Sequence, residues 1–376
     1  MRTRNFAMAL AALSLAACDT GRAQQVQPPR RVYACAASMA PDQRAADAEL
    51  RTGYAAWRQR YVTSRGAGGF LRVAIGTGRN DKTVSEGIGY GMLLAAYLDD
   101  QATFDALWAY AKRYRNARGL MAWEIEASGA RPPGAGAAAT DADEDMAFAL
   151  VVADRRWGGY RAEAVGLIGT LMRHAVEPGT FVMKPGDIWG GSEITNPSYF
   201  APAYYKVFAR YTGDARWNRV VESSYRIMDR VAARNATGLQ PDWTNSAGEP
   251  LRNHPGRGYD YTYDAARVPW RLAKDAAWNC DPRARRHLER MNGFFRRVGA
   301  RNILDGYTMA GRATAESHNA VFVAPAAAAA MMSGDAQYRA SMWAEMVRVR
   351  DRAYYGDSLR LLALLLASGN MPPPRL

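Results

Sequence analysis

The sequence has few residues suited to metal or thiol chemistry. Its 376 residues include only three cysteines and four histidines. The histidines show neither the HExxH pattern nor another paired spacing typical of zinc ligands. Gly-x-Ser-x-Gly, P-loop and Gly-x-Gly-x-x-Gly motifs are also missing, which argues against a serine hydrolase, a P-loop nucleotidase and a dinucleotide-binding fold. We therefore expect neither a metal ion nor a cofactor. We expect the chemistry to depend on carboxylates.

Runs of basic residues are missing as well, although the formal net charge is +13. Arginines and lysines occur singly or in pairs, such as Arg155-Arg156 and Arg285-Arg286, and not in runs of five or more. No helix-turn-helix or RNP-like pattern accompanies them. The charge therefore indicates a basic, solvated exterior, and we expect no nucleic-acid partner.

Long apolar runs are absent after the first two dozen residues, so no later segment reaches the roughly 18 apolar residues that cross a bilayer. Two arginines precede the short apolar stretch 6–17, which predicts a removable export signal over residues 1–23. The segment 15–18 resembles a lipobox, in which Cys18 would carry a lipid anchor; the alternative is an ordinary signal peptide. We expect an exported protein that is periplasmic, secreted or anchored to a membrane as a lipoprotein.

Two cysteines, Cys35 and Cys280, remain after this segment. In an oxidising compartment they could form a disulfide. The sequence does not fix their distance in space, so two separate buried thiols are an equal alternative.

Apolar residues recur at three- and four-residue spacing through most of the chain, which predicts twelve helices. Short connections between them favour antiparallel pairs. Six helical hairpins suggest a closed double ring, because no repeat of fixed period supports a solenoid. We expect an all-α single domain over residues 32–370, with a tether at 24–31 and a flexible tail at 371–376. The predicted helices cover residues 42–60, 86–98, 102–115, 143–154, 159–173, 199–211, 215–233, 263–278, 283–296, 317–332, 335–349 and 356–367.

The first acidic candidate, Glu86, lies at the predicted start of a helix, directly after Ser85. One interpretation is structural, with Ser85 as the helix cap and Glu86 placed favourably at the positive end of the helix dipole. The following glycines at 87, 89 and 91 favour a functional interpretation, because each destabilises a helix by about 1 kcal/mol relative to alanine. They indicate close approach of a substrate or of another backbone.

A second acidic group consists of Asp141, Asp143 and Asp145, which alternate as in an EF-hand loop. The sixth and twelfth loop positions lack the glycine and glutamate that calcium binding needs, so we exclude an EF-hand. Helix capping by Thr140 or Asp141 is one remaining interpretation. A carboxylate directed at a sugar hydroxyl is the other.

The third candidate, Asp264, precedes Arg267 by three residues. On a helix the two side chains would share a face and form an ion pair. Such a pair would keep Asp264 ionised, as a general base must be. An ordinary surface ion pair is the alternative.

Five segments, in order along the chain, resemble conserved blocks of glycoside hydrolase family 8. Ala139-Thr140-Asp141-Ala142-Asp143, continued through Met146-Ala147 to Trp157, resembles the signature of the family. The other four segments are Ser85–Met92, Asn196–Tyr205, Gln240–Trp243 and Tyr263–Arg271. The resemblance implies an (α/α)6 barrel of twelve helices and an inverting endo-hydrolase of β-1,4-linked glycans.

The resemblance also implies roles for individual residues. Glu86 would be the general acid and Asp264 the general base, while Asp141 would hold the distorted sugar at the cleavage point. Arg267 would hold Asp264, and Tyr199 would place the water or the sugar ring. Trp123 would form a stacking platform, and the remaining substrate-binding candidates are Tyr263 and Trp189.

The family includes cellulases, xylanases, lichenases and chitosanases. Chitosanase-type members lack an acid at the position of Asp264, and a basic protein is poorly suited to polycationic chitosan. We therefore expect an endo-β-1,4-glucanase (a cellulase), with xylanase and chitosanase activity as alternatives and a role in glucan digestion or in bacterial cellulose synthesis left open. A non-catalytic glycan-binding protein would show loss of a catalytic carboxylate, and none is lost. We expect a monomer, because a groove for a long chain needs open ends.

Overall fold

The computed structural model describes residues 32–251 and 258–376. The predicted export signal, Cys18 and the tether lie outside these residues. Within them, no helix is both long enough and apolar enough to cross a membrane.

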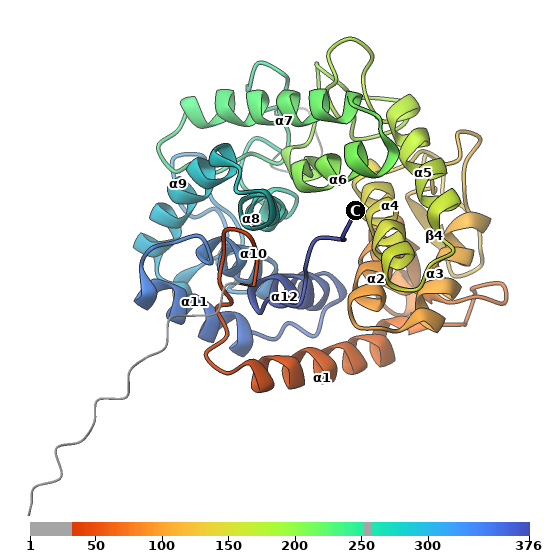
Figure 1. Ribbon diagram of the computed structural model, residues 1–376, viewed down its shortest axis with the longest axis horizontal. Coiled ribbons are helices and arrows are strands. Elements are labelled where there is room, and N and C mark those ends of the chain that lie inside the picture. Colours follow the sequence, from red (N-terminus) through yellow and green to blue (C-terminus); the bar gives the residue numbers. More distant parts are fainter. Residues whose placement is uncertain (1–31, 252–257) are drawn as a thin grey trace, which may run out of the picture.

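Twelve α-helices of the described residues form two concentric rings (Figure 1). The sequence predicted all twelve, with differences of a few residues at their ends. The outer ring consists of α1 (Gln43–Tyr61), α3 (Gln101–Arg113), α5 (Arg161–His174), α7 (Arg216–Ala233), α9 (Pro282–Val298) and α11 (Ala336–Arg348). The inner ring consists of α2 (Ser85–Tyr97), α4 (Thr140–Arg156), α6 (Pro202–Thr212), α8 (Val268–Asn279), α10 (Ala320–Ala330) and α12 (Tyr354–Ala367).

The composition of the helices explains their order in the two rings. Helix α10 is apolar on all sides and buried throughout, whereas α7 and α9 carry an apolar stripe on one face and arginines on the other. Each inner helix packs against the next, and α12 packs against α2, so the inner ring closes. This is the expected (α/α)6 barrel.

The glycines of α2 allow close packing inside the barrel. A Cβ atom on Gly89 would lie 3.0 Å from the Ala142 carbonyl oxygen of α4, and one on Gly91 would lie 2.7 Å from the Leu107 side chain of α3. Both contacts are tighter than ordinary van der Waals packing. Close approach of another backbone, one of the two alternatives, therefore accounts for Gly89. Gly91 instead makes room for a side chain, which neither alternative included.

Four short strands accompany the helices and were not predicted from the sequence. Strands β1 (Val62–Thr63) and β2 (Arg72–Val73) form one antiparallel pair, and β3 (Lys82–Val84) and β4 (Glu124–Glu126) form another. Segments of two or three residues are too short to show an alternating pattern. Strand β3 runs directly into α2, so this small sheet fixes where α2 begins.

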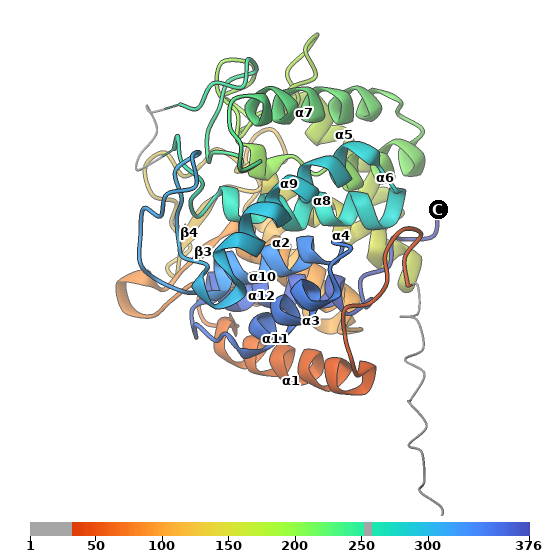
Figure 2. The ribbon, with the colours of Figure 1, turned by 90° about the vertical axis from the view of Figure 1, so that its left-hand side faces the viewer.

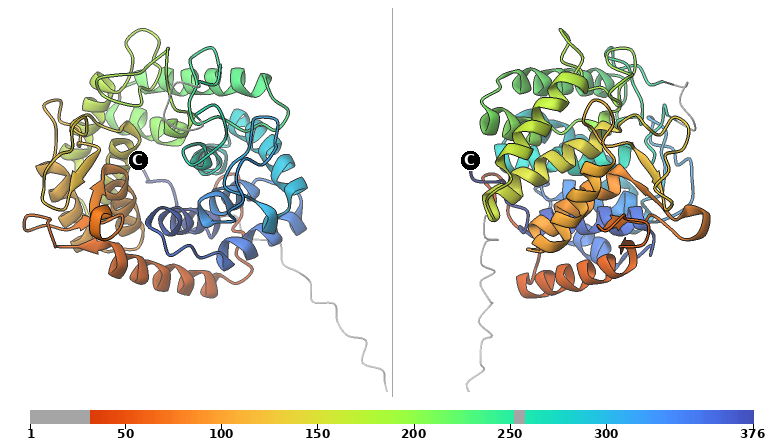
Figure 3. Two further views of the ribbon diagram at one scale, coloured as in Figure 1. Left: turned by 180° about the vertical axis from the view of Figure 1, so that it is seen from behind. Right: turned by 90° about the vertical axis from the view of Figure 1, so that its right-hand side faces the viewer.

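The inner helices run in the same direction, and the barrel therefore has two different ends. The long connections and the strands gather at the end where the inner helices begin (Figure 2). The C-terminus lies at the opposite end, near the centre of the ring (Figure 3). We call these the loop end and the closed end.

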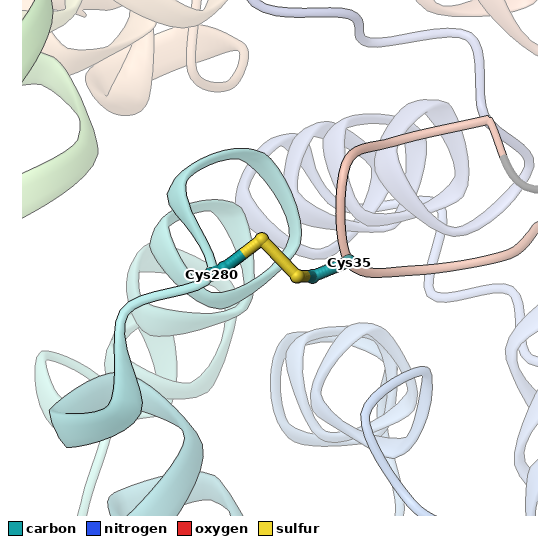
Figure 4. The surroundings of a disulfide bond; sticks show 2 residues. All are labelled: Cys35 and Cys280. Carbon is teal, nitrogen blue, oxygen red and sulfur yellow. A yellow bond between two sulfur atoms is a disulfide. The ribbon is translucent and has the colours of Figure 1, made fainter.

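A disulfide holds the closed end together. Cys280 follows α8 and pairs with Cys35 of the N-terminal segment, with their Cα atoms 5.4 Å apart (Figure 4). The Cys35 backbone N–H also donates to the carbonyl of Ala277. Of the two alternatives that the sequence left open, the structure has the disulfide.

The predicted tail does not begin at residue 371. Met371 is fully buried, and its backbone N–H donates to the Tyr33 hydroxyl. The Pro372 carbonyl accepts a hydrogen bond from Tyr97. The prolines suggested a frayed end, but the buried methionine side chain docks the start of this segment against the barrel.

Candidate active site

Three acidic residues meet at the loop end because three inner helices begin there. Glu86 lies in the first turn of α2 and Asp141 in the first turn of α4. Asp264 precedes the 3-10 helix η3 (Ala265–Arg267), which leads into α8. The ring thus brings together residues up to 178 positions apart in the sequence.

One buried arginine contacts all three carboxylates. Arg267 Nη1 lies 2.7 Å from Glu86 Oε2 and 2.5 Å from Asp141 Oδ2. Its Nη2 lies 2.8 Å from Asp264 Oδ1 and donates to the Ser198 hydroxyl at the same distance. The sequence predicted the pair with Asp264 but not the other three contacts, because those arise only when the ring closes.

The surroundings of Glu86 favour its protonated form. Burial raises the pKa of Glu86 to about 7, against the opposing effect of the positive charge of Arg267, while the nearby Asp141 carboxylate raises it further. The Tyr354 hydroxyl donates to Glu86 Oε1 at 3.0 Å and lowers the pKa. A carboxyl group with a pKa near 7 can hold a proton at neutral pH.

Asp264 has a more open position, with 36 % of its side chain exposed to solvent. The turn that carries it is held by Asp242, whose Oδ1 accepts from the backbone N–H groups of Thr262 and Ala265 at 3.1 and 2.8 Å. Burial and the neighbouring Asp264 carboxylate raise the pKa of Asp242 to about 7. No local pattern in the sequence points to a role for Asp242, although it lies in one of the five matched segments.

The three alternating aspartates of α4 point to three separate partners. Asp141 contacts Arg267, Asp143 accepts from the Met121 backbone N–H, and Asp145 pairs with Arg271. Burial raises the pKa of Asp141, and the positive charge of Arg267 opposes this effect.

The capping interpretations are wrong for both helices. Residues 84 and 139 are the caps of α2 and α4, and neither makes a side-chain capping bond. Ser85 is the first residue of α2 and does not cap it, while the Thr140 hydroxyl donates to the Lys184 carbonyl. Glu86 and Asp141 do lie in the first turns of these helices, where the helix dipole favours a negative charge, and both also contact Arg267.

The aromatic candidates lie beside the carboxylates with their rings open to solvent. Trp123, Trp189 and Tyr263 are 39 %, 36 % and 46 % exposed, and they are the only large exposed aromatic side chains of the described residues. The Trp123 carbonyl accepts from the backbone N–H of Ser85, which places this residue next to Glu86. Exposed aromatic rings near an active site are typical platforms for sugar rings.

Trp189 and Tyr199 are linked through a third aromatic residue that the sequence did not single out. The Trp189 ring stacks on Trp243, with ring centroids 5.7 Å apart, and Trp243 contacts Tyr199 at 6.4 Å. Tyr199 itself is buried beneath the Arg267 guanidinium, whose carbon lies 5.3 Å from the ring centroid. The aromatic contacts thus run from the exposed Trp189 to the arginine that holds the carboxylates.

A closed double ring of helices, with clustered carboxylates and exposed aromatic rings at one end, has the features expected of a glycoside hydrolase. The model of the glycosyl hydrolases family 8 matches residues 27–369, and the chain belongs to this family. It is therefore a glycoside hydrolase, as the sequence predicted.

Two curated relatives and one solved structure illustrate the similarity. The chain is 47 % identical to endoglucanase A of Acetivibrio thermocellus, over 90 % of this chain and 72 % of the relative. It is 44 % identical to endoglucanase 2 of Ruminiclostridium josui, over 92 % and 75 % of the two chains. The structure of a β-1,3-1,4-glucanase from Paenibacillus sp. X4 superposes with a TM-score of 0.85 at 29 % identity, covering 90 % of this chain and 96 % of that one.

Proposed function

We propose that the protein is an inverting endo-β-1,4-glucanase that hydrolyses internal bonds of cellulose-like β-glucans. The observation that carries this proposal is the group of three carboxylates around Arg267, in which the pKa of Glu86 is raised to about 7. The names of the two curated relatives, both endoglucanases, support the choice of a β-glucan.

In this mechanism Glu86 is the general acid. At neutral pH its raised pKa leaves a substantial protonated fraction, and its proton passes to the glycosidic oxygen as the bond to the anomeric carbon breaks. Burial supplies the shift, and the Tyr354 hydroxyl keeps the carboxyl group oriented.

Asp264 is the general base. It removes a proton from a water molecule, whose oxygen bonds to the anomeric carbon from the face opposite the leaving group. Its exposed position leaves room for that water, and its contact with Arg267 fixes the orientation of the side chain. Inverting enzymes hold their two carboxyl groups roughly 6.5–9.5 Å apart, a spacing compatible with two groups bridged by one guanidinium.

Asp141, Tyr199 and the exposed aromatic residues hold the substrate. One oxygen of Asp141 binds Arg267, whereas its Oδ1 is buried without a hydrogen-bond partner and could accept from a sugar hydroxyl at the cleavage point. Trp123, Trp189 and Tyr263 would stack on neighbouring sugar rings, and Tyr199 would help to place the water or the ring.

We also propose that the protein works outside the cytoplasm. The Cys35–Cys280 disulfide supports an oxidising compartment, and the sequence of residues 1–23 supports export. Attachment through a lipid on Cys18, a monomeric state and a link to cellulose synthesis remain predictions from the sequence.

Hydrolysis of a panel of soluble polymers tests the substrate. The panel contains carboxymethyl cellulose, mixed-linkage β-glucan, xylan and chitosan. We expect a rapid fall in viscosity with the two glucans, because internal cleavage shortens chains before much sugar is released. Preferential cleavage of xylan or chitosan would contradict the proposed β-glucan substrate and identify the other polymer as the substrate. No cleavage of any polymer would contradict the proposed enzymatic activity and favour a glycan-binding protein.

A further inference from the structure

A second ion pair lies one helical turn deeper in the barrel, below the pair of Asp141 and Arg267. Asp145 follows Asp141 by four residues on α4. Arg271 lies on α8, four residues after Arg267, the last residue of η3 and the N-cap of α8. Arg271 Nη1 lies 2.5 Å from Asp145 Oδ1, and its Nη2 lies 2.8 Å from Oδ2. We call Asp141–Arg267 the upper pair and Asp145–Arg271 the lower pair.

The lower pair is sealed inside the protein. Asp145 and Arg271 are each only 1 % exposed, and both carboxylate oxygens of Asp145 already bind Arg271, whereas Oδ1 of Asp141 has no partner. Beneath them the ring of Tyr204, on α6, stacks on Phe148 with centroids 3.9 Å apart. The Tyr204 hydroxyl accepts a hydrogen bond from Lys274. The lower pair is thus enclosed between the active site and an aromatic layer.

Both pairs join helices that are not neighbours in the inner ring, because α6 lies between α4 and α8 (Figure 1). A two-point contact between a guanidinium and a carboxylate fixes direction as well as distance. Four residues make slightly more than one turn, or roughly 6 Å along a helix, so the placement of the lower pair constrains the upper pair directly.

Stability alone does not explain a buried ion pair at this position. Removing two charges from water costs about as much as their attraction returns, and apolar replacements of similar volume are often as stable or more stable. A role in geometry does explain it, because catalysis is sensitive to displacements of about 1 Å.

We propose that Asp145 and Arg271 are positioning residues of the active site. Their contact sets the distance and rotation of α4 relative to α8, and so places Asp141 and Arg267 where they meet Glu86 and Asp264. This inference rests on the proposed function, since it assumes that those carboxylates carry out the reaction.

The test is the double variant Asp145→Leu with Arg271→Met, which removes both charges together. We expect its melting temperature to stay near that of the native protein, while kcat falls about 100-fold and KM changes little. A folded double variant with native kcat overturns the proposal. If the double variant does not fold, Arg271→Lys replaces it as the test, because lysine keeps the charge but loses the two-point contact. A reduced kcat at unchanged KM supports the proposal, and a native kcat overturns it.

Two controls separate this result from other causes. Asp275→Asn weakens another buried pair, in which Asp275 of α8 binds Lys206 of α6 at 2.7 Å, and it should lower the melting temperature without changing kcat. A loss of kcat in this control equal to that of the double variant would overturn a specific role of the lower pair. Glu86→Gln reports on the proposed function by itself: native activity in that variant contradicts the mechanism, whatever the lower-pair variants do.

Discussion

The two ends of the inner ring are held by different kinds of interaction. At the closed end, the disulfide and backbone hydrogen bonds tie the N-terminal segment to the barrel. The Tyr33 hydroxyl donates to the Leu366 carbonyl at 2.8 Å, and the Met39 N–H donates to the Ala367 carbonyl at the same distance. At the loop end, one buried arginine holds three carboxylates.

This difference separates stability from function. Burying several carboxylates lowers the free energy of unfolding, because each charged group loses its hydration. Such destabilising groups are retained where the reaction requires them. The charges at the closed end form separate ion pairs, such as Lys206 with Asp275 and Asp281, and no single cation among the described residues there holds three carboxylates. Changes at the loop end should therefore act mainly on activity, whereas changes at the closed end should act mainly on unfolding.

The largest effect should come from Glu86→Gln, which keeps the shape of the side chain but cannot donate an acidic proton. We expect kcat to fall about 1,000-fold, with little change in melting temperature. Glu126→Gln is the matched control, since Glu126 is exposed on β4 and touches none of the three carboxylates. Activity of Glu86→Gln within tenfold of the native protein would contradict the role of Glu86 as the general acid.

Arg267→Met should be an exception to this separation of the two ends, because a change at the loop end here lowers both activity and stability. It leaves three carboxylates, of which those of Glu86 and Asp141 are largely buried, without their cation, which should lower the free energy of unfolding by about 3–5 kcal/mol at neutral pH. The loss should be smaller at pH 5 than at pH 8. Arg267 lowers the raised pKa of Glu86, so without it the carboxyl groups keep their protons to higher pH, and at pH 5 their repulsion largely disappears.

Urea unfolding of the native protein and of Arg267→Met at both pH values measures this prediction. An equal loss of stability at pH 5 and pH 8 would show that Arg267 acts through packing and not through charge.

Replacing both Cys35 and Cys280 by serine tests the closed end. We expect the free energy of unfolding to fall by about 2–4 kcal/mol, because the unfolded chain regains freedom between distant residues. The value of kcat at 25 °C should not change. A parallel fall in kcat, measured well below the melting temperature, would show that the two ends are coupled.

Trp189→Ala should weaken substrate binding and leave the chemistry intact. Loss of one stacking platform should raise KM about fivefold, with kcat nearly unchanged. Val165→Ala is the control, because Val165 is similarly exposed but lies on the outer helix α5. If both variants change KM equally, Trp189 does not contact the substrate.

The smallest effect should come from Tyr354→Phe. The Tyr354 hydroxyl lowers the pKa of Glu86, so its removal should raise that pKa and move the basic limb of the kcat–pH profile to higher pH, by less than about one unit. A shift of that limb to lower pH would contradict Glu86 as the general acid.

The sequence was sufficient for the helices and for the principal candidates. Apolar spacing located all twelve helices, and the costly glycine at 89 correctly indicated close approach of another backbone, whereas Gly91 packs against a side chain. The resemblance to the family placed Glu86, Asp141 and Asp264 in one site before the ring was known.

Contacts made by ring closure could not be read from the sequence. Tyr354 lies 268 residues from Glu86, and no local pattern connects them. Asp242 shapes the turn before η3 from 20 residues away. The pairing of Asp145 with Arg271 likewise appears only when α4 and α8 are placed in space, since an aspartate inside a helix has no local signal for its partner.

The stereochemistry of cleavage tests the central claim most directly. Proton NMR of a soluble cello-oligosaccharide, recorded during the first minutes of hydrolysis, shows which anomer forms before mutarotation. A single displacement gives the α-anomer, because Asp264 directs water to the face opposite the leaving group. Initial formation of the β-anomer would show that the configuration is retained, and would contradict the assignment of Asp264 as the base in a single displacement.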